Sequence, residues 1–144
     1  MKVTLSEVNI NSYDVFYLYE LLKERTPEQS ISHKKMPSFR HHELFVKSRP
    51  YKAWYVIKNI APVHQPGRTN YYIGSVYITD KNEIGLFIAK NHRNYGYGAY
   101  ALEELMSLHA GPYYANINPN NKASIEFFKK FGATHIQNTY VFNK

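Results

Sequence analysis

Cysteine is absent from this sequence of 144 residues. Its absence excludes disulfide bonds, thiolate metal sites and a cysteine nucleophile together. The sequence also lacks an apolar run of the roughly 18 residues that a membrane-spanning helix needs, and residues 1–7 lack the apolar core of a signal peptide. We therefore expect a cytoplasmic protein with no membrane partner.

Positive charge is in excess but is not concentrated in one segment. The formal net charge is +7, and the longest basic runs are the pairs Lys34–Lys35 and Lys129–Lys130. A basic protein suits an anionic partner, but nucleic-acid-binding domains usually gather their charge in a patch or stripe. We predict no nucleic-acid partner. The histidines show no spacing typical of metal ligands, so we also predict no metal site.

The length and composition are those of one globular domain over residues 1–144. Hydrophobic residues make up 44% and charged residues 20% of the chain, and a chain of this size buries roughly two-thirds of its unfolded surface. Hydrophobic periodicity and turn residues predict alternating strands and helices, and hence an α/β fold with helices on both faces of a mixed sheet. The predicted strands are 3–8, 52–60, 71–79, 83–89, 113–118, 134–137 and 139–142. The predicted helices begin at Ser12, Ser38, Gly96 and Asn121.

The segment after the apolar strand 83–89 carries the most specific chemical signal. A short loop follows this strand, and a helix begins at the glycines of the pattern Arg93-x-x-Gly96-x-Gly98. Backbone N–H groups at a helix N-terminus form an anion site, and glycine lets a phosphate approach the backbone closely. The spacing does not fit a dinucleotide-binding fingerprint, and the Gly-Lys-Ser/Thr of a Walker A loop is missing.

This segment resembles motif A of the GNAT superfamily of acyl-CoA-dependent N-acetyltransferases, Gln/Arg-x-x-Gly-x-Gly/Ala. A second segment downstream is similar to another pattern common in that family, through Asn121, Ser124, Phe127 and Gly132. The resemblance covers nearly the whole order of predicted elements. It implies a small single-domain GNAT fold, with a mixed, mostly antiparallel central sheet of 6–7 strands flanked by helices on both faces.

The resemblance implies acetyl-CoA as the cosubstrate. The pantetheine would follow the end of strand 83–89, and the pyrophosphate would lie on the loop and the first turn of the next helix. The residues that the resemblance assigns to acetyl-CoA are Phe87, Ile88, Ala89, Arg93, Asn94, Tyr95, Gly96, Tyr97, Gly98, Ala99, Asn118, Asn121 and Phe128. For Asn121, the alternative is a plain helix cap.

The acid and base of the reaction are open at this stage. An acceptor amine must be neutral when it attacks the thioester, so a base or a water chain must take its proton. Glu83 and His42 are the candidate bases. Relatives often carry a tyrosine acid where this chain has Phe128, which cannot donate a proton. Tyr113 is therefore our first candidate acid, with Tyr114, Tyr140 and water as alternatives.

The acceptor is the least constrained part of the prediction. Arg25, Ile31-Ser32, His42 and Phe45 are similar to a pattern in small GNATs that acetylate nucleotide-linked amino sugars. We expect a small amine acceptor of that kind. A protein or peptide N-acetyltransferase and a non-catalytic CoA-binding module are the alternatives. The loop 61–70 would help to shape the site for either kind of acceptor. The segment 139–142 is a candidate pairing surface for a homodimer.

Overall fold

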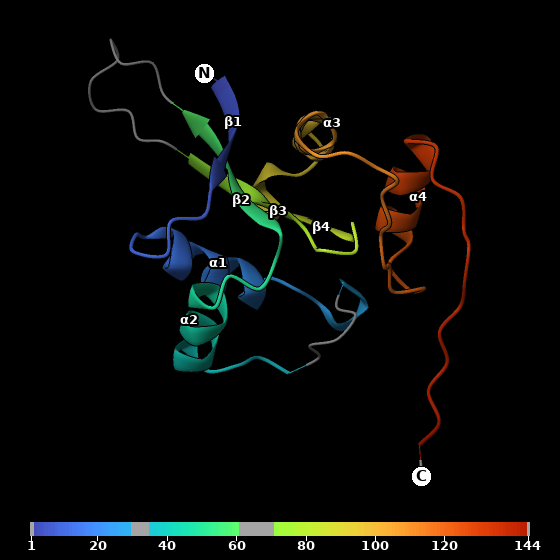
Figure 1. Ribbon diagram of the computed structural model, residues 1–144, viewed down its shortest axis with the longest axis horizontal. Coiled ribbons are helices and arrows are strands. Elements are labelled where there is room, and N and C mark those ends of the chain that lie inside the picture. The colour runs from blue at the N-terminus through green and yellow to red at the C-terminus, as the bar shows by residue number, and fades with distance from the viewer. Residues whose placement is uncertain (1, 30–34, 61–70, 144) are drawn as a thin grey trace.

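The computed structural model describes residues 2–29, 35–60 and 71–143 (Figure 1). Four strands form one antiparallel sheet in the order β1-β2-β3-β4: β1 Lys2–Glu7, β2 Ala53–Ile60, β3 Tyr71–Ile78 and β4 Ile84–Ile88. The helices are α1 Asp14–Lys23, α2 Phe39–Lys47, α3 Tyr97–Leu108 and α4 Lys122–Lys130. Short 3-10 turns occupy Pro27–Gln29 and Lys90–His92. The sequence patterns 31–33 and 61–70 lie outside the described residues.

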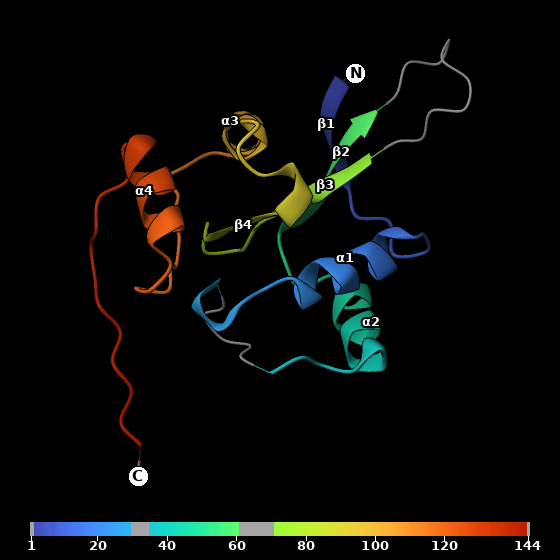
Figure 2. The ribbon, with the colours of Figure 1, turned by 180° about the vertical axis from the view of Figure 1, so that it is seen from behind.

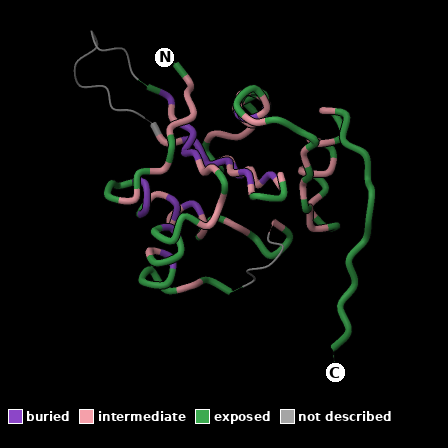
Figure 3. The backbone as a smooth tube through the Cα atoms, in the orientation of Figure 1, coloured by how far each residue is buried: buried purple, intermediate pink, exposed green. Residues whose placement is uncertain are grey.

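Helices cover both faces of the sheet, as the sequence predicts (Figures 1 and 2). Neighbouring residues of a strand point to opposite faces, and β2 shows this directly. Val56 packs with Val15 of α1 and Val46 of α2. Its neighbour Ile57 packs with the α3 residues Ala101, Leu102 and Leu105 on the other face. The fully buried residues lie mainly along β2, β3 and the inward sides of these helices (Figure 3).

Helix ends follow the expected capping chemistry closely. Ser38 caps α2, because its hydroxyl accepts a hydrogen bond from the N–H of His41. Asn121 caps α4 by accepting from the N–H of Ser124. Ser12 accepts from the N–H of Asp14, one residue away from the assigned N-cap of α1. None of the helices in the described part of the chain is long and apolar enough to span a membrane.

The prediction of 6–7 strands is wrong, because the sheet has four among the described residues. The backbone of the segment 113–118 pairs with the sheet only at an isolated parallel bridge between Glu83 and Tyr114. The N–H of Ile84 donates to the carbonyl of Tyr114 over 2.6 Å, and no further pairing with β4 follows. The segment thus diverges from β4, and the gap between them becomes the site described below.

The two predicted C-terminal strands are also absent. Residues 133–143 run away from α4 as an extended segment (Figures 1 and 2). Its apolar side chains are exposed, up to 89% at Phe142. The alternation of apolar and polar residues here is typical of a strand, but a strand forms only where an edge supplies hydrogen bonds. No described residue supplies that edge in this chain.

Candidate active site

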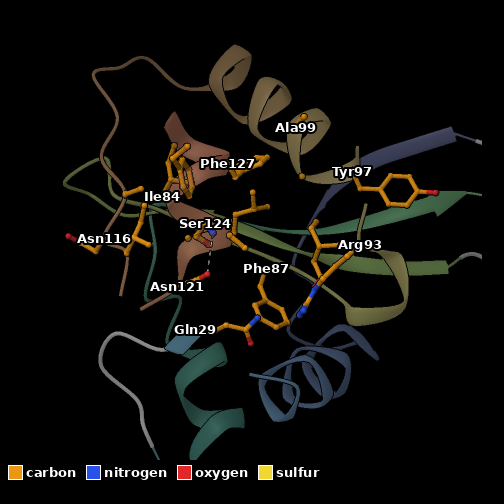
Figure 4. A pocket seen from close by; sticks show the side chains of 18 of the residues that line it. Gln29, Ile84, Phe87, Arg93, Tyr97, Ala99, Asn116, Asn121, Ser124 and Phe127 are labelled. Carbon is orange, nitrogen blue, oxygen red and sulfur yellow. Dashed lines mark hydrogen bonds between the residues drawn. The ribbon is translucent and has the colours of Figure 1, made fainter. Parts of the chain in front are cut away.

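A pocket opens where β4 and the segment 115–118 diverge, and α4 and the start of α3 close its other sides (Figure 4). Its volume is about 710 Å³, which lies within the range of small-molecule and cofactor sites. The lining residues that the sequence singles out are Arg25, Glu83, Phe87, Ile88, Arg93, Asn94, Gly96, Tyr97, Gly98, Ala99, Asn118, Asn121, Ser124, Phe127 and Phe128.

The N-terminus of α3 forms one end of this pocket. Gly96 precedes the helix in the left-handed region, with φ of 82°, and no side chain caps the helix there. Nothing lies within 4 Å of the position that a Cβ at Gly96 would take. The N–H groups of the first helical turn have no partner within the helix and carry the positive end of its dipole. The geometry and partial charge at this end of the pocket therefore suit an anion.

Arg93 is fixed beside that helix end. Its Nε donates to the carbonyl oxygen of Ile88 over 3.0 Å. Its guanidinium lies over the ring of Phe87, 5.1 Å from the ring centroid. The arginine of the sequence motif is thus held by β4 and presents a cation to the pocket (Figure 4).

The α4 wall is apolar and carries a capped helix start. Phe127 and Phe128 meet edge to face, with ring centroids 5.2 Å apart. Phe127 also lies 3.4 Å from the position that a Cβ at Gly98 would take, which is ordinary contact. The cap predicted as the alternative role of Asn121 is confirmed, since its Oδ1 accepts from the N–H of Ser124 over 3.2 Å. Its contact with a cofactor stays a prediction.

Glu83 lies at the other end of the pocket, where β4 begins. The side-chain amide of Asn116 donates to Glu83 Oε2 over 2.6 Å. The N–H of Glu83 donates to the hydroxyl of Thr79 over 3.0 Å, and that hydroxyl lies 3.4 Å from Glu83 Oε1. Two side chains, one from the segment 115–118 and one just after β3, therefore hold this carboxylate in one orientation at the pocket wall.

Two stacked tyrosines form a pocket wall that sequence reasoning missed. Tyr51 and Tyr77 are parallel, with ring centroids 3.8 Å apart. The ring of Tyr77 occupies the space above Gly85, its directly paired residue on β4. A tyrosine paired with a glycine on the neighbouring strand indicates that the ring lies over the glycine. The sequence alone does not give the register that pairs Tyr77 with Gly85. Arg25 and Gln29, which follow α1, line the same side.

The structure places four predicted site residues outside the pocket lining. His42 is 5% exposed between α1 and α2, where its Nε2 lies 2.9 Å from the carbonyl oxygen of Val15. The hydroxyl of Tyr113 donates to backbone carbonyls of Met106 and His109. The N–H of Ala89 donates to Ile73, and Tyr95 is an exposed residue. Burial lowers the pKa of His42, which favours the neutral form of its ring.

The family model of the acetyltransferase (GNAT) family matches residues 16–133. The chain belongs to the GNAT acetyltransferase family. It is accordingly an acetyl-CoA-dependent N-acetyltransferase. A search of curated proteins found no significant match.

Solved structures share the fold of this GNAT protein at low sequence identity. A domain from Methanocaldococcus jannaschii has a TM-score of 0.69 and 20% identity, with 91% of this chain and 87% of that chain covered. The yncA protein of Salmonella typhimurium, solved with acetyl-CoA, has a TM-score of 0.68 and 15% identity, with coverage of 92% and 79%. Mutant forms of the spermidine/spermine N-acetyltransferase SpeG from Vibrio cholerae have a TM-score of 0.65 and 15% identity, with 99% of this chain and 87% of that chain covered.

The residues of this GNAT pocket fit acetyl-CoA. The uncapped start of α3 and the open space at Gly96 suit the pyrophosphate, and Arg93 supplies a fixed cation beside them. From Gly85 onward, no described strand pairs with the edge of β4 that faces the pocket. The carbonyl oxygen of Ile88 accepts from Arg93, and the other backbone groups of this edge are available to the pantetheine amides. No cluster of three or more metal-ligating side chains occurs within the described residues.

Proposed function

We propose that this protein transfers the acetyl group of acetyl-CoA to the primary amine of a small acceptor, such as a nucleotide-linked amino sugar. The observation that carries the proposal is the composition of the pocket on the α1 side. A carboxylate, a pair of stacked aromatic rings and a guanidinium line that side together, at Glu83, Tyr51–Tyr77 and Arg25. Such a wall offers a proton acceptor, a flat apolar platform and a cation to one small molecule.

Glu83 acts in this proposal as the general base. Bound acetyl-CoA supplies a thioester as the electrophile. The Glu83 carboxylate attracts the acceptor as an ammonium ion and takes a proton from it, directly or through one water molecule. Asn116 and Thr79 hold the carboxylate in place, so the base is already oriented before the acceptor binds.

No acid among the predicted tyrosines is needed for the leaving group. Phe128 cannot donate a proton, and Tyr113 points to the backbone of α3. A thiol loses its proton near pH 8.5, so a thiolate leaves readily near neutral pH and water can protonate it. His42 is not proposed as the base, because its ring lies in the contact between α1 and α2.

The test is a thiol-release assay with acetyl-CoA and a panel of acceptors. The protein has no cysteine, so it adds no thiol background. The panel contains nucleotide-linked amino sugars, simple amines and peptides with free N-termini. We expect release with a nucleotide-linked amino sugar. Release with peptides alone would replace the small-molecule acceptor by a protein, and no release across the panel would contradict the proposal.

The base is tested by replacing the carboxylate with an amide of the same shape. Glu83→Gln keeps the hydrogen-bonding size of the side chain, and we expect kcat to fall by about 10²- to 10⁴-fold. Glu103→Gln, at an exposed position of α3 outside the pocket, is the matched control and should leave kcat unchanged. Equal kcat values for the two variants would exclude Glu83 as the base.

A further inference from the structure

We propose that Arg25 binds an anionic group of the acceptor, a phosphate or a carboxylate, at a distance of the order of 10 Å from the reacting amine. This inference rests on the proposed function, because it assigns the acceptor to the α1 side of the pocket. It makes Arg25 a residue that selects among acceptors.

The first observation is an unused hydrogen-bond donor. Arg25 Nε is buried and has no hydrogen-bond partner. Among the described residues, the guanidinium has no ion pair, and it lies over the ring of Phe87, 5.2 Å from the ring centroid. A buried donor of a charged group that has no hydrogen-bond partner is unfavourable, because it has lost its water and gained nothing in return. A bound anion would satisfy it.

The second observation is a second cation on the same ring. The guanidinium of Arg93 lies 5.1 Å from the centroid of Phe87, so one aromatic ring contacts two positive charges. Glu24, which lies beside Arg25 in the chain, accepts a hydrogen bond from the N–H of Lys90 instead. Neither guanidinium has an ion pair among the described residues, and two such positive charges around one ring favour the binding of an anion nearby.

The position of Arg25 favours the acceptor as the source of that anion. Arg25 follows α1, and it lines the pocket with Gln29 and Tyr51 on that face of the sheet. The ring of Phe87 also points to this face, because it packs with Leu21 of α1. The N-terminus of α3, with its free N–H groups, lies at the start of the helix that covers the opposite face and is available to the phosphates of the cofactor.

The spacing along β4 sets the length of the acceptor. Glu83 and Phe87 are four residues apart, so their side chains share one face of the strand. Four residues of extended chain span about 13 Å. An acceptor whose amine lies at Glu83 and whose anion lies at Arg25 must bridge a distance of that order. This length excludes an α-amino acid, whose carboxylate is next to its amine, and fits an amino sugar carried on a diphosphate.

The experiment compares a charged acceptor with its uncharged counterpart. The pair is a nucleoside-diphosphate-linked amino sugar and the matching free amino sugar, assayed with the wild type, Arg25→Gln and Arg25→Lys. We expect Arg25→Gln to raise KM for the charged acceptor about 10- to 100-fold, with little change in kcat and none in KM for acetyl-CoA. Arg25→Lys should retain part of the preference, and Arg40→Gln on the exposed side of α2 should retain all of it.

Two results would overturn the inference. One is a rise in KM for acetyl-CoA in Arg25→Gln equal to or larger than the rise for the acceptor, which would assign Arg25 to the cofactor. The other is an unchanged preference for the charged acceptor. If the wild type turns over neither sugar, the proposed function fails first, and titration of the CoA-saturated protein with uridine diphosphate still tests Arg25. Binding that Arg25→Gln and Arg25→Lys leave unchanged would exclude the anion site.

Discussion

Two glycines on adjacent strands predict opposite outcomes for the same substitution. A Cβ at Gly85 would lie 2.1 Å from Cζ of Tyr77, which is the far end of a side chain. A Cβ at Gly74 would lie 2.3 Å from the backbone oxygen of Phe87 and 3.0 Å from Cα of Ile88. A side chain can move away from a new methyl group, but the backbone of a paired strand cannot move without breaking the sheet.

The expected magnitudes follow from these contacts. Gly85→Ala displaces Tyr77 from its stack on Tyr51, a loss of about 0.5–1.5 kcal/mol. The loss of chain freedom at the former glycine restores roughly 0.5–1 kcal/mol. The free energy of unfolding should therefore change by less than about 1 kcal/mol. Gly74→Ala should lower it by about 2–3 kcal/mol through overpacking, which corresponds to a decrease in Tm of roughly 5–10 °C.

The effect on acceptor binding should be larger for Gly85→Ala, the substitution that is expected to change stability less. Gly85→Ala moves a wall of the pocket, so KM for the acceptor should rise several-fold while KM for acetyl-CoA stays constant. Urea unfolding gives the two free energies, and steady-state kinetics with each substrate varied gives the KM values. Equal destabilisation by both substitutions would refute the reasoning about which atoms can move. An unchanged KM for the acceptor in Gly85→Ala would show that Tyr77 does not border the acceptor.

Three further predictions concern single positions. Burial lowers the pKa of His42, so its contribution to stability is full above its unfolded pKa near 6.5 and is lost as the pH falls through the lowered folded pKa. His42→Gln should reduce the fall in unfolding free energy between pH 7.5 and 5.5, measured with urea, and should retain activity. Gly96→Ala should lower stability by about 1–2 kcal/mol, because φ is 82° there, and calorimetry should show weaker CoA binding; unchanged binding would contradict the assigned phosphate site. We expect the protein to self-associate through its exposed C-terminal apolar side chains, Tyr140, Val141 and Phe142. Sedimentation velocity should show a smaller dimer fraction for Phe142→Ser than for the wild type. A monomeric wild type would refute this expectation.

The sequence predicted correctly the elements whose ends are marked by residues at those ends, such as glycines and helix-capping side chains. The loop from Arg93 to Gly98 and the caps at Ser38 and Asn121 fall where glycine, serine and asparagine indicate them. The loop and helix start that we assign to the cofactor were predictable as local structure for the same reason, because one continuous segment builds them. Their contact with acetyl-CoA stays a prediction.

Pairing between distant segments limited the rest of the prediction. Residues 113–118 have the composition of a strand, but a single bridge at Tyr114 is all that joins them to β4. His42 looks like a base in the sequence and is a core residue, because the face of α2 that it occupies is set by contact with α1. The acceptor wall needs the register that brings Tyr77 over Gly85 and the end of α1 to Phe87. None of these relations is encoded in a local pattern.

The aromatic wall also gives the molecule an internal optical reporter. The chain has one tryptophan, Trp54. Its ring meets Tyr51 edge-on, with centroids 4.8 Å apart, and Tyr77 at 6.3 Å. Any acceptor that touches the stacked tyrosines therefore alters the surroundings of the only indole in the protein. Tryptophan emission of the unlabelled protein should therefore change when an acceptor occupies this side of the pocket. Binding of a ligand at the α3 end should leave the emission unchanged.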